Sequence, residues 1–132
     1  MAKKSKKLVL IDSGVVFEYL KGDEKIRTEI LDNIGIENTC VSTITVLETY
    51  YGMLKKETKS TKAFFKEVNQ LTIDGETCQE AIGLMLSYRG SRIALADCLI
   101  AATCIVNNAE LYTFNVRDFE YIKGIKQYKI KG

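Results

Sequence analysis

The chain has 132 residues, of which 46% are hydrophobic and 27% are charged. This size and composition suit one domain with its own core and leave little room for a second. We expect a basic tail over residues 1–7 and a single domain over residues 8–132. No apolar run reaches the roughly 18 residues that cross a bilayer, and the start of the chain shows no signal-peptide pattern, so we expect a cytoplasmic protein without a membrane segment.

The chain contains no histidine. This excludes Ser-His-Asp and Cys-His catalytic pairs, and any zinc site with histidine ligands. The four cysteines never approach a C-x-x-C spacing and lie in apolar runs, so we expect buried free thiols and a reducing compartment. They are Cys40, Cys78, Cys98 and Cys104. Catalytic chemistry therefore has to use carboxylates, lysines, tyrosines or thiols.

The formal net charge of +2 is unevenly distributed. Four lysines lie within residues 1–7, and the remainder carries 15 basic and 17 acidic groups, which argues against a protein that coats DNA. Residues 52–67 hold five lysines and two glutamates between aromatic side chains. This segment predicts either a solvated helix face or an edge that contacts phosphates. The candidate RNA contacts in it are Lys55, Lys59 and Lys62.

The first part of the chain predicts strands that alternate with helices. The apolar run before Asp12 is typical of a strand covered on both faces. Gly22 stops the first helix and Asp23 caps the next. The expected elements are a strand at 8–11, helices at 15–21 and 24–33, a strand at 38–42 and a helix at about 43–56. The apolar stripe expected on the last helix is Ile44, Leu47, Tyr51 and Leu54.

The second part continues the alternation. The helix at 95–106 is almost wholly apolar, which predicts burial against a sheet, and Asn107-Asn108 ends it. The expected elements are helices at 61–71, 76–88 and 95–106, a strand at 110–114, a helical turn at 118–122 and a strand at 126–130. Strands separated by helices predict an α/β fold, a three-layer α/β/α sandwich with a mostly parallel central sheet.

Four acids lie at or near strand-to-helix transitions: Asp12, Glu48, Asp97 and Asp118. Each alone has an ordinary explanation, as a helix cap or a solvated side chain. A fold that brings these transitions together would crowd like charges, which is unfavourable unless cations neutralise them or protons are taken up. Oxygen ligands without histidine or thiolate suit Mg²⁺ or Mn²⁺. The sequence therefore indicates a possible metal site at the carboxyl edge of the sheet.

With these acids in place, the chain resembles the PIN-domain ribonucleases, and most closely the VapC toxins of toxin-antitoxin pairs. The resemblance spans residues 8–130 and depends on the order and spacing of motifs that are individually weak. These are LIDS at 10–13, VSTITVLETYYG at 41–52, LADCLIAAT at 95–103, TFNVRDF at 113–119 and IKGI at 122–125.

The resemblance implies metal-dependent hydrolysis of RNA phosphodiester bonds. Asp12, Glu48, Asp97 and Asp118 take the places of the family's metal-binding catalytic acids. Ser13 keeps the hydroxyl that follows the first acid, and Asn115 matches a polar residue beside the fourth. Gly14 departs from the family, which commonly has asparagine or serine there, so we expect a side-chain contact to be lost and the turn that supports Asp12 to be looser.

The resemblance also implies partners, namely a homodimer and an antitoxin protein. The helices after the first two strands carry many large side chains, which either mark an interface or pack inside the core. They are Val15, Val16, Phe17, Tyr19, Leu20, Tyr50, Tyr51, Met53 and Leu54.

Three alternatives stay open. A receiver domain shares the α/β order but needs adjacent acids after the first strand, where this chain has only Asp12. A catalytically inactive PIN-like module would bind RNA or protein without cutting. A PIN nuclease of RNA maturation would share the site and differ in its biological context.

Overall fold

The computed structural model describes residues 7–91 and 93–131 of the chain. Residues 1–6 of the expected basic tail lie outside this part. The four strands are β1 (Val9–Ile11), β2 (Thr39–Ser42), β3 (Asn69–Leu71) and β4 (Glu110–Tyr112). They form one sheet in the order β3-β2-β1-β4, and all neighbouring strands are parallel. The strand order changes direction at β1, so the crevice at the carboxyl ends of β1 and β4 is where such sheets bind ligands.

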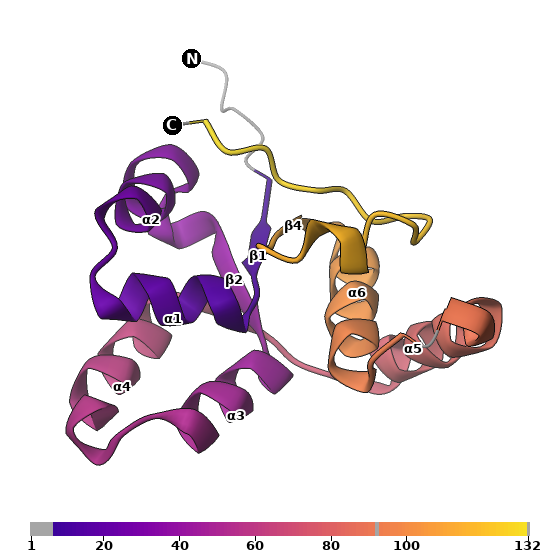
Figure 1. The fold of residues 1–132 in the computed structure, drawn as a ribbon, viewed down its shortest axis with the longest axis horizontal. Coiled ribbons are helices and arrows are strands. Elements are labelled where there is room, and N and C mark those ends of the chain that lie inside the picture. Colours follow the sequence, from indigo (N-terminus) through magenta and orange to yellow (C-terminus); the bar gives the residue numbers. More distant parts are fainter. Residues whose placement is uncertain (1–6, 92, 132) are drawn as a thin grey trace.

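Helices cover both faces of this sheet, as the sequence predicts. In Figure 1, α1, α2 and α4 lie on one side of the strands and α5 and α6 on the other. The α-helices are α1 (Ser13–Lys21), α2 (Glu24–Thr28), α3 (Thr43–Gly52), α4 (Thr58–Glu67), α5 (Gly75–Ser87) and α6 (Leu95–Asn107). The shorter helical segments are the π-helix η1 (Glu29–Ile34) and the 3-10 turns η2 (Ile36–Asn38), η3 (Lys55–Glu57), η4 (Arg89–Ser91) and η5 (Val116–Asp118). None of the helices in the described residues is long and apolar enough to span a membrane.

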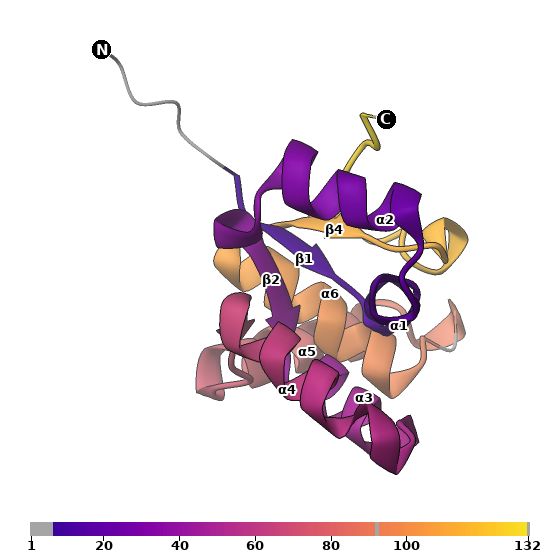
Figure 2. The same cartoon turned by 90° about the vertical axis from the view of Figure 1, so that its left-hand side faces the viewer.

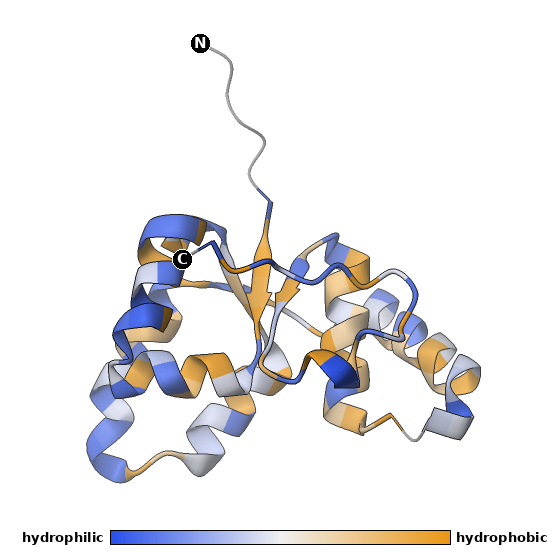
Figure 3. Cartoon of the chain, turned by 45° about the horizontal axis from the view of Figure 1, so that its top comes forward, coloured by the Kyte–Doolittle hydropathy of each residue, from blue (hydrophilic) through white to orange (hydrophobic). Residues whose placement is uncertain are grey.

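The side chains of alternate strand residues belong to two separate hydrophobic cores, one on each face of the sheet. Leu10, Cys40 and Leu111 pack with side chains of α5 and α6, whereas Val9 and Ile11 pack with side chains of α1, η1 and α4. Figure 3 shows orange, apolar strands between helices whose ribbons alternate between hydrophilic and hydrophobic residues. Burying one such large side chain stabilises the fold by about 1.5 to 3 kcal/mol. The continuous apolar run of the first strand is explained by this burial on both faces.

The predicted stop of the first helix at Gly22 and the cap of the next at Asp23 are confirmed, but three bounds are corrected. Helix α1 begins at Ser13 instead of residue 15, the helix expected at 24–33 is divided into α2 and η1, and the helix expected at about 43–56 ends at Gly52. The carboxylate of Asp12 accepts a hydrogen bond from the Val15 backbone N–H at 3.4 Å, and the Asp23 carboxylate accepts one from Ile26 at 3.1 Å. Gly22 ends α1 with a φ of 92°, in the left-handed region where glycine has no steric penalty. Helix α1 therefore runs regularly through Gly14, and the turn that follows Asp12 is well formed.

The apolar stripe expected on α3 is wrong in most of its members. Leu47 is 60% exposed and Tyr51 is 96% exposed, and Leu54, beyond the end of the helix, is exposed too. Thr45 and Thr49 are buried instead. The Thr49 hydroxyl donates to the Thr45 carbonyl at 2.7 Å, which satisfies its hydroxyl inside the helix. Because α3 packs against α1, α4 and α6, small β-branched side chains face its neighbours and larger ones face outward.

Three further expectations are corrected. The helix expected at 61–71 is α4, which ends at Glu67, and the last three residues form strand β3. This short edge strand carries the polar residues Asn69 and Gln70, so it shows no apolar alternation. The helical turn expected at 118–122 starts earlier, as η5. Cys78 is exposed, although the other three cysteines are buried as expected.

The strand expected at 126–130 is also absent from the described residues as a regular element. Only one bridge, between Leu111 and Gln127, joins this segment to the sheet. It is held instead by Glu29, a buried acid of η1. The Glu29 carboxylate accepts hydrogen bonds from the Tyr128 hydroxyl at 2.5 Å and from the Lys131 backbone N–H at 2.9 Å. Hydrogen bonds to the Glu29 side chain therefore hold this segment, in place of the backbone hydrogen bonds of the strand that the sequence predicts.

Candidate active site

The topology brings the four predicted acids toward one edge of the sheet. Asp12 follows β1 directly, and Glu48 lies on α3, which follows β2. Asp97 lies in the first turn of α6, the helix that leads into β4, and Asp118 lies in η5 after β4. Figure 2 shows β1 and β2 pointing toward the end of the molecule where α1 and α3 lie. Asp12 and Asp118 therefore follow strands, Asp97 lies at the start of a helix, and Glu48 lies in the middle of the helix that follows β2.

Asp12 is the most enclosed of the four, with only 5% of its surface exposed. One carboxylate oxygen caps α1, and the other accepts a short hydrogen bond from the Thr113 hydroxyl. Burial raises the pKa of Asp12, and the hydrogen bonds from Thr113 and from the first turn of α1 oppose that rise. Asp12 is thus held in one orientation by strands β1 and β4 together.

The pKa of Asp97 depends on the charges of the other three acids. Burial raises the pKa of Asp97, and the negative charges of Asp118, Asp12 and Glu48 raise it further, in that order. Like charges raise the pKa of a carboxyl by disfavouring its ionised form. The four acids therefore lie toward the same edge of the sheet without forming a tight cluster; Glu48 is half-buried and Asp118 is exposed.

Thr113 is a site residue that the sequence reasoning missed. Its hydroxyl donates to Asp12 and accepts a hydrogen bond from the Asn115 backbone N–H at 3.0 Å. The sequence does contain a feature that could have revealed it: a threonine directly follows the buried strand β4, which lies beside β1, the strand that leads into Asp12. Asn115 itself is exposed and supports the site through its backbone, whereas Ser13 is half-buried at the start of α1.

The predicted RNA contacts lie elsewhere on the molecule. Lys55 belongs to η3, and Lys59 and Lys62 belong to α4; all three side chains are exposed. The elements η3 and α4 also contribute Lys56, Glu57 and Ser60 to the groove described next, but the three predicted lysines are not among its lining residues.

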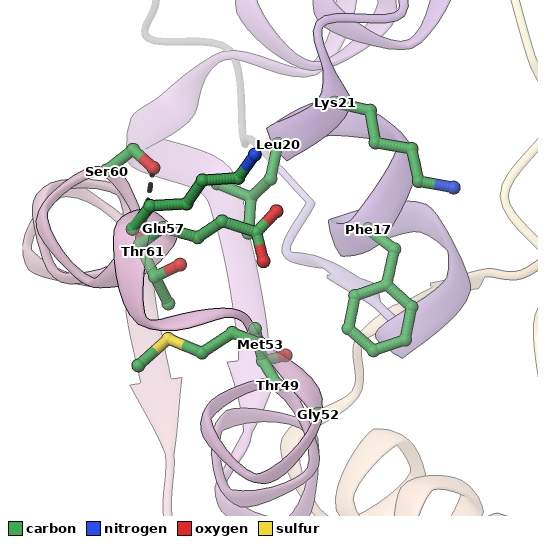
Figure 4. Close-up of a pocket in the computed structure, with 10 residues that line it drawn as sticks. Phe17, Leu20, Lys21, Thr49, Gly52, Met53, Glu57, Ser60 and Thr61 are labelled. Atoms are coloured by element: carbon green, nitrogen blue, oxygen red, sulfur yellow. Dashed lines mark hydrogen bonds between the residues drawn. The ribbon is translucent and has the colours of Figure 1, made fainter.

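A groove of about 480 Å³ lies between α1, the end of α3, η3 and α4. Figure 4 shows Phe17 and Leu20 of α1 on one side and Met53, Glu57 and Thr61 on the other. The two helices that wall the groove, α1 and α3, also border the acids, through Asp12 and Glu48. Of the side chains expected to mark an interface, Val15 and Val16 are buried in the core, whereas Phe17, Tyr51 and Leu54 are exposed.

The donor set fits a hard divalent cation. All four candidate ligands are carboxylates, which suit Mg²⁺ or Mn²⁺. In residues 7–91 and 93–131, no three carboxylate or thiol groups stand close enough to hold an ion as they are. Mg²⁺ commonly keeps several water ligands and uses only one or two carboxylates, so a more open arrangement suits it. A cation here would also relieve the repulsion around Asp97.

The model of the PIN domain family matches residues 9–125. The chain therefore belongs to the PIN domain family, as its motifs predict, and the receiver-domain alternative is set aside.

Among individual proteins, the chain is similar to two ribonucleases named VapC. It is 33% identical to Ribonuclease VapC1 of Methanocaldococcus jannaschii over 131 residues, which cover 96% of this chain and 90% of that protein. It is 31% identical to Ribonuclease VapC19 of Mycobacterium tuberculosis over 115 residues, which cover 83% of this chain and 90% of the relative.

Solved structures share the fold. The crystal structure of DNA-bound VapBC from Salmonella typhimurium matches with a TM-score of 0.83 at 22% identity, covering 92% of this chain and 97% of that one. A toxin-antitoxin complex from Klebsiella pneumoniae matches with a TM-score of 0.77 at 24% identity, covering 92% and 99%.

Proposed function

We propose that this chain is an endoribonuclease of the VapC type, which hydrolyses RNA phosphodiester bonds with the help of Mg²⁺ or Mn²⁺ and serves as the toxin of a toxin-antitoxin pair. The observation that carries the proposal is the placement of the four acids, Asp12, Glu48, Asp97 and Asp118, on elements that meet at the carboxyl edge of the sheet. Two relatives named ribonuclease VapC, each covering most of the chain, support the same activity.

The residues have distinct roles in this proposal. Asp12, Asp97 and Asp118 would hold the cation, and Glu48 would hold a second one or orient the attacking water. A bound divalent cation lowers the pKa of a water ligand and neutralises charge that develops on the phosphate. Thr113 keeps one oxygen of Asp12 fixed, so this ligand is oriented before the substrate arrives. The absence of histidine sets aside a route in which histidines activate the 2′-hydroxyl.

The test is cleavage of RNA by the purified protein. We expect cleavage with Mg²⁺ or Mn²⁺ and none with chelator, and we expect Asp97→Asn to lower kcat/KM by more than about tenfold, because one ligand contributes at least about 1.4 kcal/mol to the transition state. Asp32→Asn is the matched control, since it removes the same charge from the exposed surface of η1. Full activity in chelator, or in Asp97→Asn, would refute the mechanism. An inert wild-type protein that binds Mn²⁺ would favour the catalytically inactive module.

We propose that the groove between α1, α3 and α4 receives a segment of the antitoxin. Its floor includes apolar side chains such as Leu20 and Met53, and Tyr51 and Leu54 are exposed on α3 and just after it. Exposed apolar side chains grouped in this way usually mark an interface. Because α1 and α3 also carry Asp12 and Glu48, a basic side chain of the same segment could reach these acids and compete with the cation.

Expression in a bacterial host distinguishes the toxin from a nuclease of RNA maturation. A toxin arrests growth when it is expressed alone, and co-expression of its neighbouring gene restores growth. Normal growth with an active enzyme would favour the maturation role.

We also propose that two copies of this chain form a homodimer. Exposed apolar side chains on α5 and α6 support it, namely Ile82, Leu86 and Leu95. Light scattering at micromolar concentration tests this proposal, and a monomer would exclude the dimer.

A further inference from the structure

Tyr121 lies in the segment that follows η5, the turn that carries Asp118. It lies three residues after Asp118, and its side chain is 39% exposed. Burial raises the pKa of Tyr121, and the charges of Asp97 and Asp118 raise it further. The phenol therefore lies within electrostatic range of two of the four candidate ligands, with part of its ring open to solvent.

The backbone that carries Tyr121 is anchored on both sides. Phe119 is fully buried and Ile122 is nearly so, and both belong to the core against α5 and α6. One residue further on, the Lys123 backbone N–H donates to the Tyr88 hydroxyl at 2.9 Å. An exposed ring on such a fixed segment is oriented before any ligand arrives.

The ring itself is supported from one side. Tyr88, at the end of α5, meets Tyr121 edge-on, with 5.4 Å between the ring centroids and 73° between the planes. Aromatic pairs favour this arrangement, which holds one ring in place and leaves part of it uncovered. Exposed cationic residues flank the pair in the chain, namely Arg89, Arg117 and Lys123.

These features together match how proteins hold single-stranded RNA. Bases of a single strand stack on aromatic side chains, and nearby cations contact the phosphates. A strand whose phosphate reaches the acids has its neighbouring bases within a few ångströms of that edge. We infer that Tyr121 is the platform on which an unpaired base next to the scissile phosphate stacks. This inference rests on the proposed ribonuclease activity and goes beyond it, because it names the form of RNA that the site accepts.

The chain has no tryptophan, which permits a direct test of stacking. Tyr121→Trp introduces one tryptophan at the proposed platform, and Leu31→Trp is the control, because Leu31 is an exposed side chain beside the amino ends of the strands. Both are titrated in chelator with a single-stranded oligoribonucleotide and with its duplex. We expect quenching of the tryptophan at 121 by the single strand, with little quenching by the duplex and little at 31.

Kinetics provide the second readout. Loss of one stacked base weakens binding by roughly 5- to 100-fold, so we expect Tyr121→Ala to raise KM by that factor with a smaller effect on kcat. Tyr121→Phe restores most of the affinity, since stacking needs the ring and not the hydroxyl. No quenching at 121, an unchanged KM in Tyr121→Ala, or a change only in oligomeric state would overturn the inference. Quenching in Tyr121→Trp together with a wild-type protein that does not cleave would refute the proposed activity and not the platform.

Discussion

Thr113→Val removes the hydroxyl that orients Asp12 and changes little of the side-chain volume. Hydrogen bonds to ionised groups contribute about 1.5 to 3 kcal/mol when they are buried. The variant also loses the acceptor of the Asn115 backbone N–H. We expect a free energy of unfolding about 2 kcal/mol lower at neutral pH, which corresponds to a fall in Tm of roughly 6 to 10 °C for a chain of this size.

The loss of stability should depend on pH. The Thr113 hydroxyl favours the ionised form of Asp12, whereas burial raises the pKa of this carboxyl above its usual value. As the pH falls through the folded-state pKa, Asp12 takes up a proton and the hydroxyl loses its charged partner. The difference in stability between wild type and variant should therefore be largest at neutral pH and shrink in acid.

Thermal unfolding in chelator at several pH values measures this dependence, and RNA cleavage measures the effect on catalysis. Loss of an outer partner of a metal ligand typically lowers activity by about 10- to 100-fold. Thr113→Ser should retain most of both properties. Thr103→Val is the matched control, because its hydroxyl is buried on α6 and bonds only to the Leu99 carbonyl. A stability loss equal at all pH values, or full activity in Thr113→Val, would refute this role.

Four other changes have expected outcomes. In chelator, Asp97→Asn should raise Tm although it abolishes cleavage, because it removes a partly buried charge that faces three other acids; a lower Tm would contradict this. Under the same conditions wild type should gain stability as the pH falls from neutral, since the pKa values of Asp12 and Asp97 are both raised. Tyr51→Ser should leave stability within about 0.5 kcal/mol and weaken antitoxin binding more than tenfold, as calorimetry can show. Replacing Lys55, Lys59 and Lys62 together by glutamine should flatten the salt dependence of RNA binding. The slope of the logarithm of the binding constant against the logarithm of the salt concentration should fall by up to about 2 to 3, and an unchanged slope would mark a solvated face.

Local chemistry accounts for what the sequence predicts well. Asp12, Gly22 and Asp23 define their helix ends through side-chain and backbone preferences that act within a few residues. The apolar runs at Val9–Ile11 and in α6 are long enough to require burial wherever the chain places them. The acids could be grouped because parallel strands put their carboxyl ends at one edge.

The remaining features depend on tertiary neighbours. Leu47 is exposed because of how α3 packs against other helices, and the pattern of α3 alone cannot reveal that. Strand β3 exists because β2 offers an edge, not because Asn69 and Gln70 favour a strand. Thr113 meets Asp12 only after β4 has paired with β1, and Tyr121 meets Tyr88 only after the segment that follows β4 has packed beside the end of α5.

The contact of Glu29 with the last residues has a consequence for how the domain is completed. Glu29 belongs to the first crossover of the sheet, yet two of its hydrogen-bond donors, Tyr128 and Lys131, are synthesised about a hundred residues later. During translation these donors leave the ribosome after all four strands, because they lie further along the chain. The helical layer around η1 therefore reaches its final hydrogen bonding only after the strands of the sheet have emerged, and a substitution at Tyr128 acts on the first crossover of the fold.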